Sequence, residues 1–233
     1  METDLLATCM AALELLFSGD AELWTIIWVS FRVSMTAILI AAVPAILLGF
    51  VLAMVPFPGR WMVVAFFNAL MSVPTVVVGL TLYLLLSRSG PFGDLHLLFT
   101  QPAMVVGQVL LCLPVLVCMS HAAFQGIDRR AWETARTLGA SHWRALLTLT
   151  LEARFALLGA VLAGFGRIIS EVGCSMMVGG NILSYTRNIP TAIALETSKG
   201  QFAQGVALGL VLLVLALTLN FVLASVRGKG QLV

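Results

Sequence analysis

The chain alternates long apolar stretches with short polar ones, and the apolar stretches have the length of membrane helices. A helix crosses the hydrocarbon core of a bilayer with about 20 mostly apolar residues. Four stretches of 23 to 27 positions carry no charge, namely residues 33–55, 61–87, 101–127 and 200–226. A fifth stretch, residues 155–185, is also apolar but contains Arg167 and Glu171. The pattern predicts five membrane spans.

The N-terminal part extends this pattern before the first uncharged stretch. Residues 24–31 are apolar and hold two tryptophans, which favour the membrane interface, so the first span should begin before residue 33. Residues 5–17 are apolar too, but they are too short to span and contain Glu14. We expect residues 1–22 to form an interfacial segment. No basic region precedes it, so we expect no cleaved signal peptide.

Composition supports a membrane protein. Hydrophobic residues make up 60% of the 233 positions and charged residues 10%, whereas a soluble domain carries about a quarter charged residues. The mean hydropathy is +1.03. A membrane barrel would instead show segments of roughly ten residues with alternating polarity. We therefore expect an all-α integral membrane protein, with residues 1–233 as a single transmembrane domain, surrounded by lipid and without a nucleic-acid partner.

Basic residues predict the orientation of the chain. Cytoplasmic loops are enriched in Lys and Arg. One set of loops holds eight of them, namely Arg60, Arg129, Arg130, Arg136, Arg144, Arg154, Arg227 and Lys229. The opposite set holds only Arg88, Arg187 and Lys199. The N-terminus is therefore predicted outside and the C-terminus in the cytoplasm.

Residues 128–152 form an unusually polar segment on the predicted cytoplasmic side. Asp128 suits a helix N-cap, Gly139 would end or turn that helix, and Ser141 would cap a second one. The sequence thus predicts a helix–turn–helix. Its first helix could present an apolar anchor with a charged rim, as a docking surface does. It could equally be an amphipathic linker resting on lipid headgroups.

The spacing within this segment resembles the cytoplasmic loop of ABC importer permeases. That loop carries Glu-Ala-Ala, three residues, Gly, nine residues and Ile-x-Leu-Pro. This chain has Glu133-Thr134-Ala135, then Gly139, then Leu149-Thr150-Leu151-Glu152 at the same spacing. Glu152 departs from the family's proline, which puts the kink after the loop in question.

The resemblance implies a type I permease fold and a coupling helix that docks on a separate ATPase subunit. The residues that would make this contact are Trp132, Glu133, Ala135, Leu138 and Gly139. A phosphate-binding loop of the form G-x-x-x-x-G-K-[ST] is not present, because neither lysine of the chain lies in that pattern. The chain is therefore not expected to be an enzyme or to bind a cofactor, and the partner subunit would use ATP and Mg.

Two charges lie inside residues 155–185, which form the fourth predicted span in chain order. Arg167 and Glu171 are four residues apart and share a helix face. They could form a neutral pair that fixes the helix, or Arg167 could offer positive potential beside an anion pathway. Around them, residues 164–181 are rich in glycine, which is consistent with either a lumen or close helix packing. The candidate pathway or gate residues are Arg167, Ser170, Glu171, Ser175, Gly179, Gly180 and Asn181.

Three further stretches indicate which group of ABC importer permeases the chain resembles. Residues 72–93, 165–182 and 186–202 look like the permeases of tungstate importers, and less closely like those for molybdate and sulfate. The implied function is uptake of an oxyanion, tungstate first and molybdate next, from an extracellular or periplasmic binding protein across the cell (inner) membrane. Two permease copies and two ATPase subunits would form the assembly. The external loop at 181–200 could contact the binding protein or be a solvated loop.

Other classes of protein remain as alternatives. A secondary transporter or channel for a small anion would work without an ATPase, but it would need an internal repeat or a lone ion-coupling carboxylate. A membrane enzyme would need paired carboxylates, a nucleophile or a metal site. The three histidines are scattered and the four cysteines show no CxxC spacing, so no metal site is predicted. An assembly or anchor subunit would not need the glycine-rich fourth span.

Overall fold

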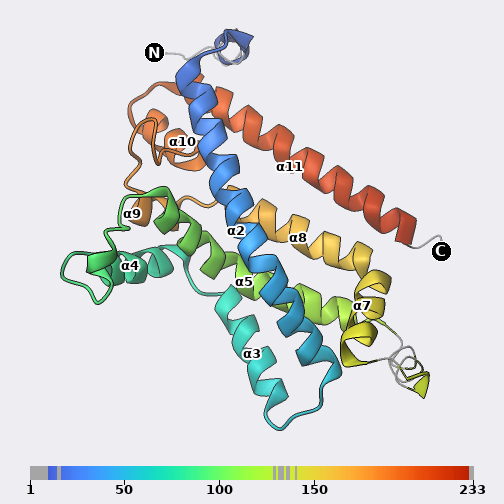
Figure 1. Cartoon of the computed structure of the whole chain (residues 1–233). Helices are drawn as coiled ribbons and strands as arrows, with labels where there is room; N and C mark the ends of the chain where they lie inside the picture. The colour runs from blue at the N-terminus through green and yellow to red at the C-terminus, as the bar shows by residue number, and fades with distance from the viewer. Residues whose placement is uncertain are drawn as a thin grey trace.

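The computed structural model describes residues 10–14, 17–127, 130, 134, 137–139 and 141–230, and this part of the chain is helical with no strand. Figure 1 shows the long helices crossing one another as a splayed bundle. In chain order the elements are α2 (Ala21–Met54), α3 (Arg60–Met71), α4 (Thr75–Leu86), the short 3₁₀ turn η1 (Gly93–Leu95), α5 (Gln101–Gln125), α7 (His142–Glu152), α8 (Arg154–Ile169), α9 (Gly173–Gly179), α10 (Ile189–Ser198) and α11 (Phe202–Gly230).

Three helices are long and apolar enough to cross a membrane by themselves, namely α2, α5 and α11. Two bent pairs bring the number of spans to as many as five: α3 with α4, bent by 94°, and α7 with α8, bent by 74°. The all-helical membrane class predicted from the sequence is confirmed. Pro74 marks the sharper bend as the N-cap of α4, whereas Pro44 and Pro114 lie inside continuous helices.

The first helix begins well before the uncharged stretch, as expected. Asp20 caps α2 by accepting a hydrogen bond from the Leu23 amide at 2.9 Å. The helix packs along α5, and Gly49 lets the two backbones approach closely, because a Cβ there would lie 2.6 Å from Ser120 Cβ. Alanines of α2 and apolar side chains of α5 and α8 form the largest core cluster.

The fourth predicted span, residues 155–185, is wrong as a continuous helix. The structure divides it into α8, a break at residues 170–172, and the short α9, which ends at Gly179. Side chains stabilise the break: Ser170 Oγ donates to carbonyls of the preceding turn, and Glu171 Oε1 accepts the Cys174 amide at 3.2 Å. Gly180 is the left-handed C-cap of α9, with φ 68°.

The interpretation of residues 181–200 as a loop is also wrong. Residues 189–198 form α10, which begins with a capping box between Asn188 and Thr191. Its buried side chains pack against the first turns of α2 and against α11. Ser30 Oγ of α2 accepts the Ile189 amide at 2.6 Å, which fixes the start of α10 against the bundle.

The predicted second helix of the polar segment is confirmed as α7. Ser141 Oγ accepts the Arg144 amide at 3.3 Å, and Gly139 adopts φ 83° in the turn before it. The chain bends by 74° directly after Glu152, so the kink forms without the family's proline. Asp128, Trp132, Glu133 and Ala135 lie outside the described residues, and Leu138 is 82% exposed.

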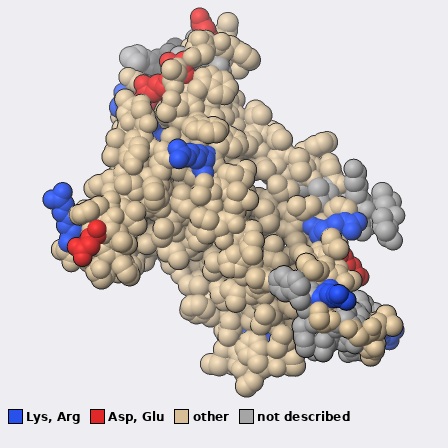
Figure 2. All heavy atoms as spheres, in the orientation of Figure 1, with Lys and Arg blue, Asp and Glu red and all other residues tan. Residues whose placement is uncertain are grey.

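Figure 2 shows how charge is distributed on one face of the bundle. Uncharged residues cover most of its middle. Several Lys and Arg lie around the end that holds α7 and others lie at the left and in the upper part of the view, whereas most of the visible Asp and Glu lie toward the start of α2. A broad uncharged zone between two charged ends is what a membrane-embedded helical protein requires.

Candidate translocation site

Two interruptions of the membrane helices lie against each other, and most of the residues that form them are exposed on the chain. One is the turn at residues 72–74 between α3 and α4, and the other is the turn at residues 170–172 between α8 and α9. A Cβ on Gly173 would lie 2.8 Å from Val76 Cγ2 and 3.2 Å from Thr75 Oγ1. The N-terminal ends of α4 and α9 are therefore in direct contact. Within a membrane, irregular backbone is tolerated where it is enclosed by protein or faces water.

The start of α4 contributes unpaired backbone groups to this place. Its N-cap is Pro74, which makes no side-chain capping bond. The first amides of a helix have no partner within the helix, and they carry the positive end of the helix dipole. The start of α4 therefore offers positive potential where the two breaks meet.

Arg167 and Glu171 form the predicted ion pair at this break. Arg167 Nη1 lies 3.6 Å from Glu171 Oε2. The two side chains differ sharply in exposure, at 47% for Arg167 and 5% for Glu171. Because the other carboxylate oxygen accepts the Cys174 amide, Glu171 is fixed at the start of α9. The pair thus places an anchored carboxylate inside the protein and an accessible guanidinium at its surface.

Glycines hold α9 tightly against its neighbours. A Cβ on Gly79 of α4 would lie 2.8 Å from Cys174 Cα, and a Cβ on Gly107 of α5 would lie 2.6 Å from Cys174 Sγ. Cys174 is buried between these two glycines. This close packing leaves α9 little freedom to move independently of α4 and α5.

The remaining predicted pathway residues separate into two groups. Ser170 is exposed beside Arg167, and Ser175 is buried one turn into α9 with no hydrogen-bond partner for its hydroxyl in the described part of the chain. Gly179, Gly180 and Asn181 lie at the opposite end of α9, about 10 Å away by helix rise. There Gly179 packs on Met104 and Gly180 on Phe99. The structure does not bring the second group to the ion pair.

Sequence analysis missed the contribution of α4 to this site. Thr75 and Val76 contact Gly173 through sequence-distant breaks. The signal in the sequence is Pro74, which lies inside the apolar stretch 61–87. A proline between two helix segments interrupts the first and cannot cap the second with its side chain. The motif Ser72-Val73-Pro74-Thr75 could therefore have indicated that one helix ends and another begins here.

Arg187, expected on an external loop, is instead largely buried in an ionic cluster. Its Nη1 lies 3.3 Å from Glu22 Oε1 of α2 and 3.9 Å from Glu196 Oε1 of α10. Lys199 Nζ lies 2.9 Å from the same Glu196 oxygen. The cluster joins α10 to the start of α2. Of its two basic side chains, Lys199 is more exposed than Arg187.

The sequence profile described as "Binding-protein-dependent transport system inner membrane component" matches residues 45–227. A tungstate uptake system permease protein of Peptoclostridium acidaminophilum is 39% identical over 217 residues, covering 93% of this chain and 95% of that protein. Its counterpart of the same description in Campylobacter jejuni is 45% identical over 152 residues, covering 65% of this chain and 64% of that protein. A molybdenum transport system permease protein of Escherichia coli K12 is 29% identical, covering 76% of this chain and 82% of that protein.

Solved structures share the fold. A chain of a bacterial alginate ABC transporter, crystallised in complex with an alginate-bound periplasmic protein, matches with a TM-score of 0.73 at 18% identity, covering 93% of this chain and 86% of that chain. A chain of the MetNI methionine ABC transporter in an inward-facing conformation matches with a TM-score of 0.66 at 16% identity, covering 98% of this chain and 99% of that chain. At these identities the likeness establishes the architecture alone.

Proposed function

Because the chain belongs to the family of binding-protein-dependent transport system inner membrane components, we propose that it is the permease of an ATP-driven importer for tungstate. The family is the multi-pass membrane component of ABC importers, not the ATPase. Among oxyanions, tungstate is best supported, because relatives at 39% and 45% identity are tungstate permeases, whereas a molybdenum permease is at 29%.

The single observation that carries the proposal is the 39% identity to a tungstate permease across 93% of this chain. That alignment includes both helix breaks and the polar segment before α7. Molybdate is the second substrate to consider, since it is a tetrahedral oxyanion of the same charge and similar shape.

We propose that the chain works with partners that supply what it lacks. A separate ATPase subunit would bind ATP and Mg, an extracellular or periplasmic protein would deliver the oxyanion, and a second copy of the chain would complete the pathway. The concentration of basic side chains around α7 favours a cytoplasmic position for that end (Figure 2), and hence an external N-terminus and import toward α7.

The ion pair suggests how the pathway would handle an anion. Arg167 would contact the oxyanion through its exposed guanidinium, and the start of α4 would add positive potential. Glu171, anchored behind Arg167, would compensate part of that charge and keep the contact weak. Weak contact matters because a pathway must release its solute as readily as it admits it.

The polar segment would transmit the ATPase cycle. Ser141 and Gly139 fix the turn at the start of α7, and the 74° bend after Glu152 joins α7 to α8. Since α8 holds Arg167 in its last turn, a displacement at the turn before α7 would reach the helix break through α7, the bend and α8. The proposed docking residues Trp132, Glu133, Ala135, Leu138 and Gly139 precede this connection.

The proposal is tested by deleting the chain's gene in its native host and measuring cellular tungsten at nanomolar external tungstate. We expect accumulation to fall to the background level and to return on complementation. Excess molybdate should compete more strongly than sulfate. Unchanged tungsten accumulation in the deletion strain would refute the substrate. Purification of the tagged permease should also recover an ATPase, which a secondary transporter or channel would not require.

A further inference from the structure

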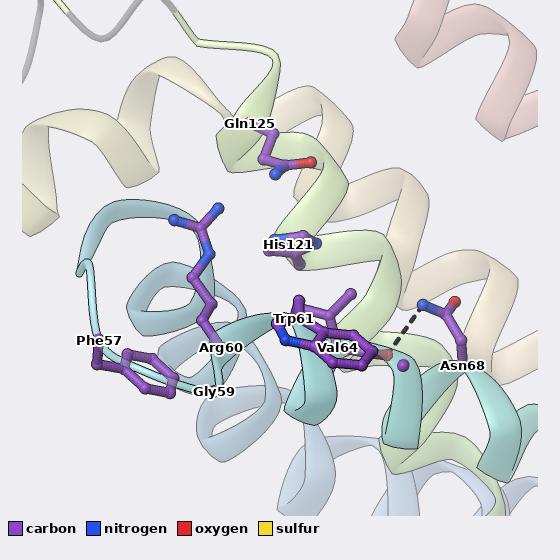
Figure 3. Close-up of a pocket in the computed structure, with 9 residues that line it drawn as sticks. Phe57, Gly59, Arg60, Trp61, Val64, Asn68, His121 and Gln125 are labelled. Carbon is purple, nitrogen blue, oxygen red and sulfur yellow. Dashed lines mark hydrogen bonds between the residues drawn. The ribbon is translucent and has the colours of Figure 1, made fainter.

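A second cavity lies at the end of the bundle where α3 begins and α5 ends, away from the paired helix breaks. It has a volume of about 560 Å³ and is open to the surface. Its lining combines aromatic and apolar side chains with Arg60, Asn68, His121 and Gln125. Figure 3 shows the Arg60 guanidinium and the His121 ring approaching the same space from α3 and α5, with Gln125 beyond them.

Arg60 brings a positive charge to this cavity. Within the described residues no carboxylate forms an ion pair with it and its side chain makes no hydrogen bond. It also lines an adjoining pocket with Gln125 and Phe124. The turn before it places Gly59 in the left-handed region, at φ 81°, as an N-cap without a side-chain bond. The charge of Arg60 and the uncapped helix start both favour an anion.

His121 provides an independent indication of a ligand. Its side chain is buried, at 8% exposure, and the ring interacts with the backbone of Leu52. Its Nε2 atom has no hydrogen-bond partner in the described part of the chain. Buried polar atoms are almost always paired, so an unpaired nitrogen that lines a cavity calls for a partner. By contrast, Asn68 is already satisfied by the Val64 carbonyl at 2.9 Å.

The size and lining of the cavity distinguish among anions. A free tetrahedral oxyanion would fill only a small part of the volume. Phe57, Val64, Ala65 and the rim residue Trp61, which is 72% exposed, offer apolar surface beside the cation. Aromatic side chains and arginines near the ends of spans are typical of the headgroup region, and basic pockets between membrane helices bind acidic lipid headgroups.

We propose that this cavity binds the phosphate group of an anionic phospholipid. Arg60 pairs with the phosphate, His121 Nε2 and the Gln125 amide complete its hydrogen bonds, and the aromatic rim contacts the glycerol and the first acyl carbons. This site is separate from the transported oxyanion and would hold α3 against α5 at the membrane surface. Binding to the purified chain needs neither the ATPase nor tungstate, so the test is independent of the transport proposal.

The test is native mass spectrometry of the full-length chain with phosphatidylglycerol or phosphatidylcholine of equal chain length. We expect phosphatidylglycerol to bind about tenfold more tightly, and Arg60→Gln to remove that preference. Arg144→Gln removes an exposed arginine of α7 and is the matched control. This variant should keep the preference for phosphatidylglycerol. His121→Asn keeps an amide near Leu52 but loses Nε2 and should weaken binding, whereas His121→Gln, which can reach the Nε2 position, should restore it.

A phosphate titration at constant ionic strength identifies the source of the phosphate group. Stabilisation of the chain by millimolar inorganic phosphate, dependent on Arg60 and accompanied by lipid displacement, would keep the phosphate site but assign it to the free ion. Failure of phosphate to displace the lipid would support the phospholipid. Equal binding of both lipids, with no effect of Arg60→Gln, would overturn the proposal. It would also be overturned if Arg60→Gln left lipid binding unchanged but abolished a dimer of the chain, because Arg60 would then serve the contact between the two copies.

Discussion

Glu171 is fixed to the backbone of α9 while its partner Arg167 remains half exposed at the end of α8, with 3.6 Å between Nη1 and Oε2. The carboxylate therefore determines where the guanidinium lies, and its charge limits how strongly that guanidinium can hold an anion. We expect Arg167→Gln to reduce the tungstate uptake rate roughly tenfold or more, because a charge-assisted contact to the oxyanion is lost.

Arg167→Lys should retain part of the activity, since the positive charge remains. Ser225→Ala is the control away from the break, because the exposed Ser225 hydroxyl donates to the Phe221 carbonyl of its own helix. Uptake is measured per amount of membrane-inserted protein. Equal uptake by wild type and Arg167→Gln would place the ion pair outside the pathway.

The contact of α9 with α4 and α5 depends on two glycines facing one cysteine. Gly79→Ala should lower the free energy of unfolding by about 1–3 kcal/mol, because its Cβ meets the backbone of Cys174. The Cβ of Gly107→Ala would clash with the Cys174 sulfur, so adding Cys174→Ala should largely restore the stability of Gly107→Ala. The same second change should not restore Gly79→Ala, whose clash is with the backbone. Gly209→Ala, with open space around the added Cβ, is the neutral control. Apparent melting temperatures in detergent measure all of these variants, and additive effects for Gly107 and Cys174 would contradict the packing.

The turn before α7 requires a left-handed residue. Gly139 has φ 83° and open space around it, so Gly139→Ala costs about 1–2 kcal/mol from backbone strain alone. Gly139→Asn should be better tolerated, because asparagine enters this region more readily. We expect Gly139→Ala to reduce ATP-driven uptake, measured with the ATPase present, while the protein still inserts. Gly126→Ala, at a right-handed position of φ −72°, should behave as wild type.

The ionic cluster that joins α10 to the start of α2 makes a further prediction about stability. Arg187→Met removes the cation between Glu22 and the buried Glu196 and should destabilise the chain by about 1–3 kcal/mol. Glu22→Gln should cost less than about 1 kcal/mol, because Glu22 is 42% exposed. Thermal unfolding of the two variants side by side measures the difference. If Glu22→Gln proved the more damaging change, Arg187 would not be the centre of the cluster.

The hydrophobic pattern predicted the membrane class and the early start of α2, and residue type predicted the Ser141 cap. These features are local: charge-free length sets a span, and a cap needs only its own next turn. The same reasoning missed α10, although Asn188 followed by Pro190 and Thr191 is a helix-start signal. The short polar residues between residue 181 and Asn188 favour a loop and obscure that signal.

Features that depend on distant parts of the chain could not be predicted. The 94° bend at Pro74 and the contact of Thr75 with Gly173 depend on how two broken spans pack, which no local pattern specifies. The burial of Arg187 likewise depends on Glu22, which lies 165 positions away in the chain. The ion pair at residues 167 and 171 was predictable because its partners are four positions apart in the sequence, and it forms although Glu171 lies in the break after α8.

The most direct measurement is tungstate accumulation in proteoliposomes that contain the purified permease and its ATPase, with the tungstate-loaded binding protein on the outside. The account predicts accumulation that requires ATP inside the vesicles, the ATPase and the binding protein, and that falls about tenfold or more with Arg167→Gln. Accumulation by the permease alone without ATP, or none for tungstate when all components hydrolyse ATP, would contradict it.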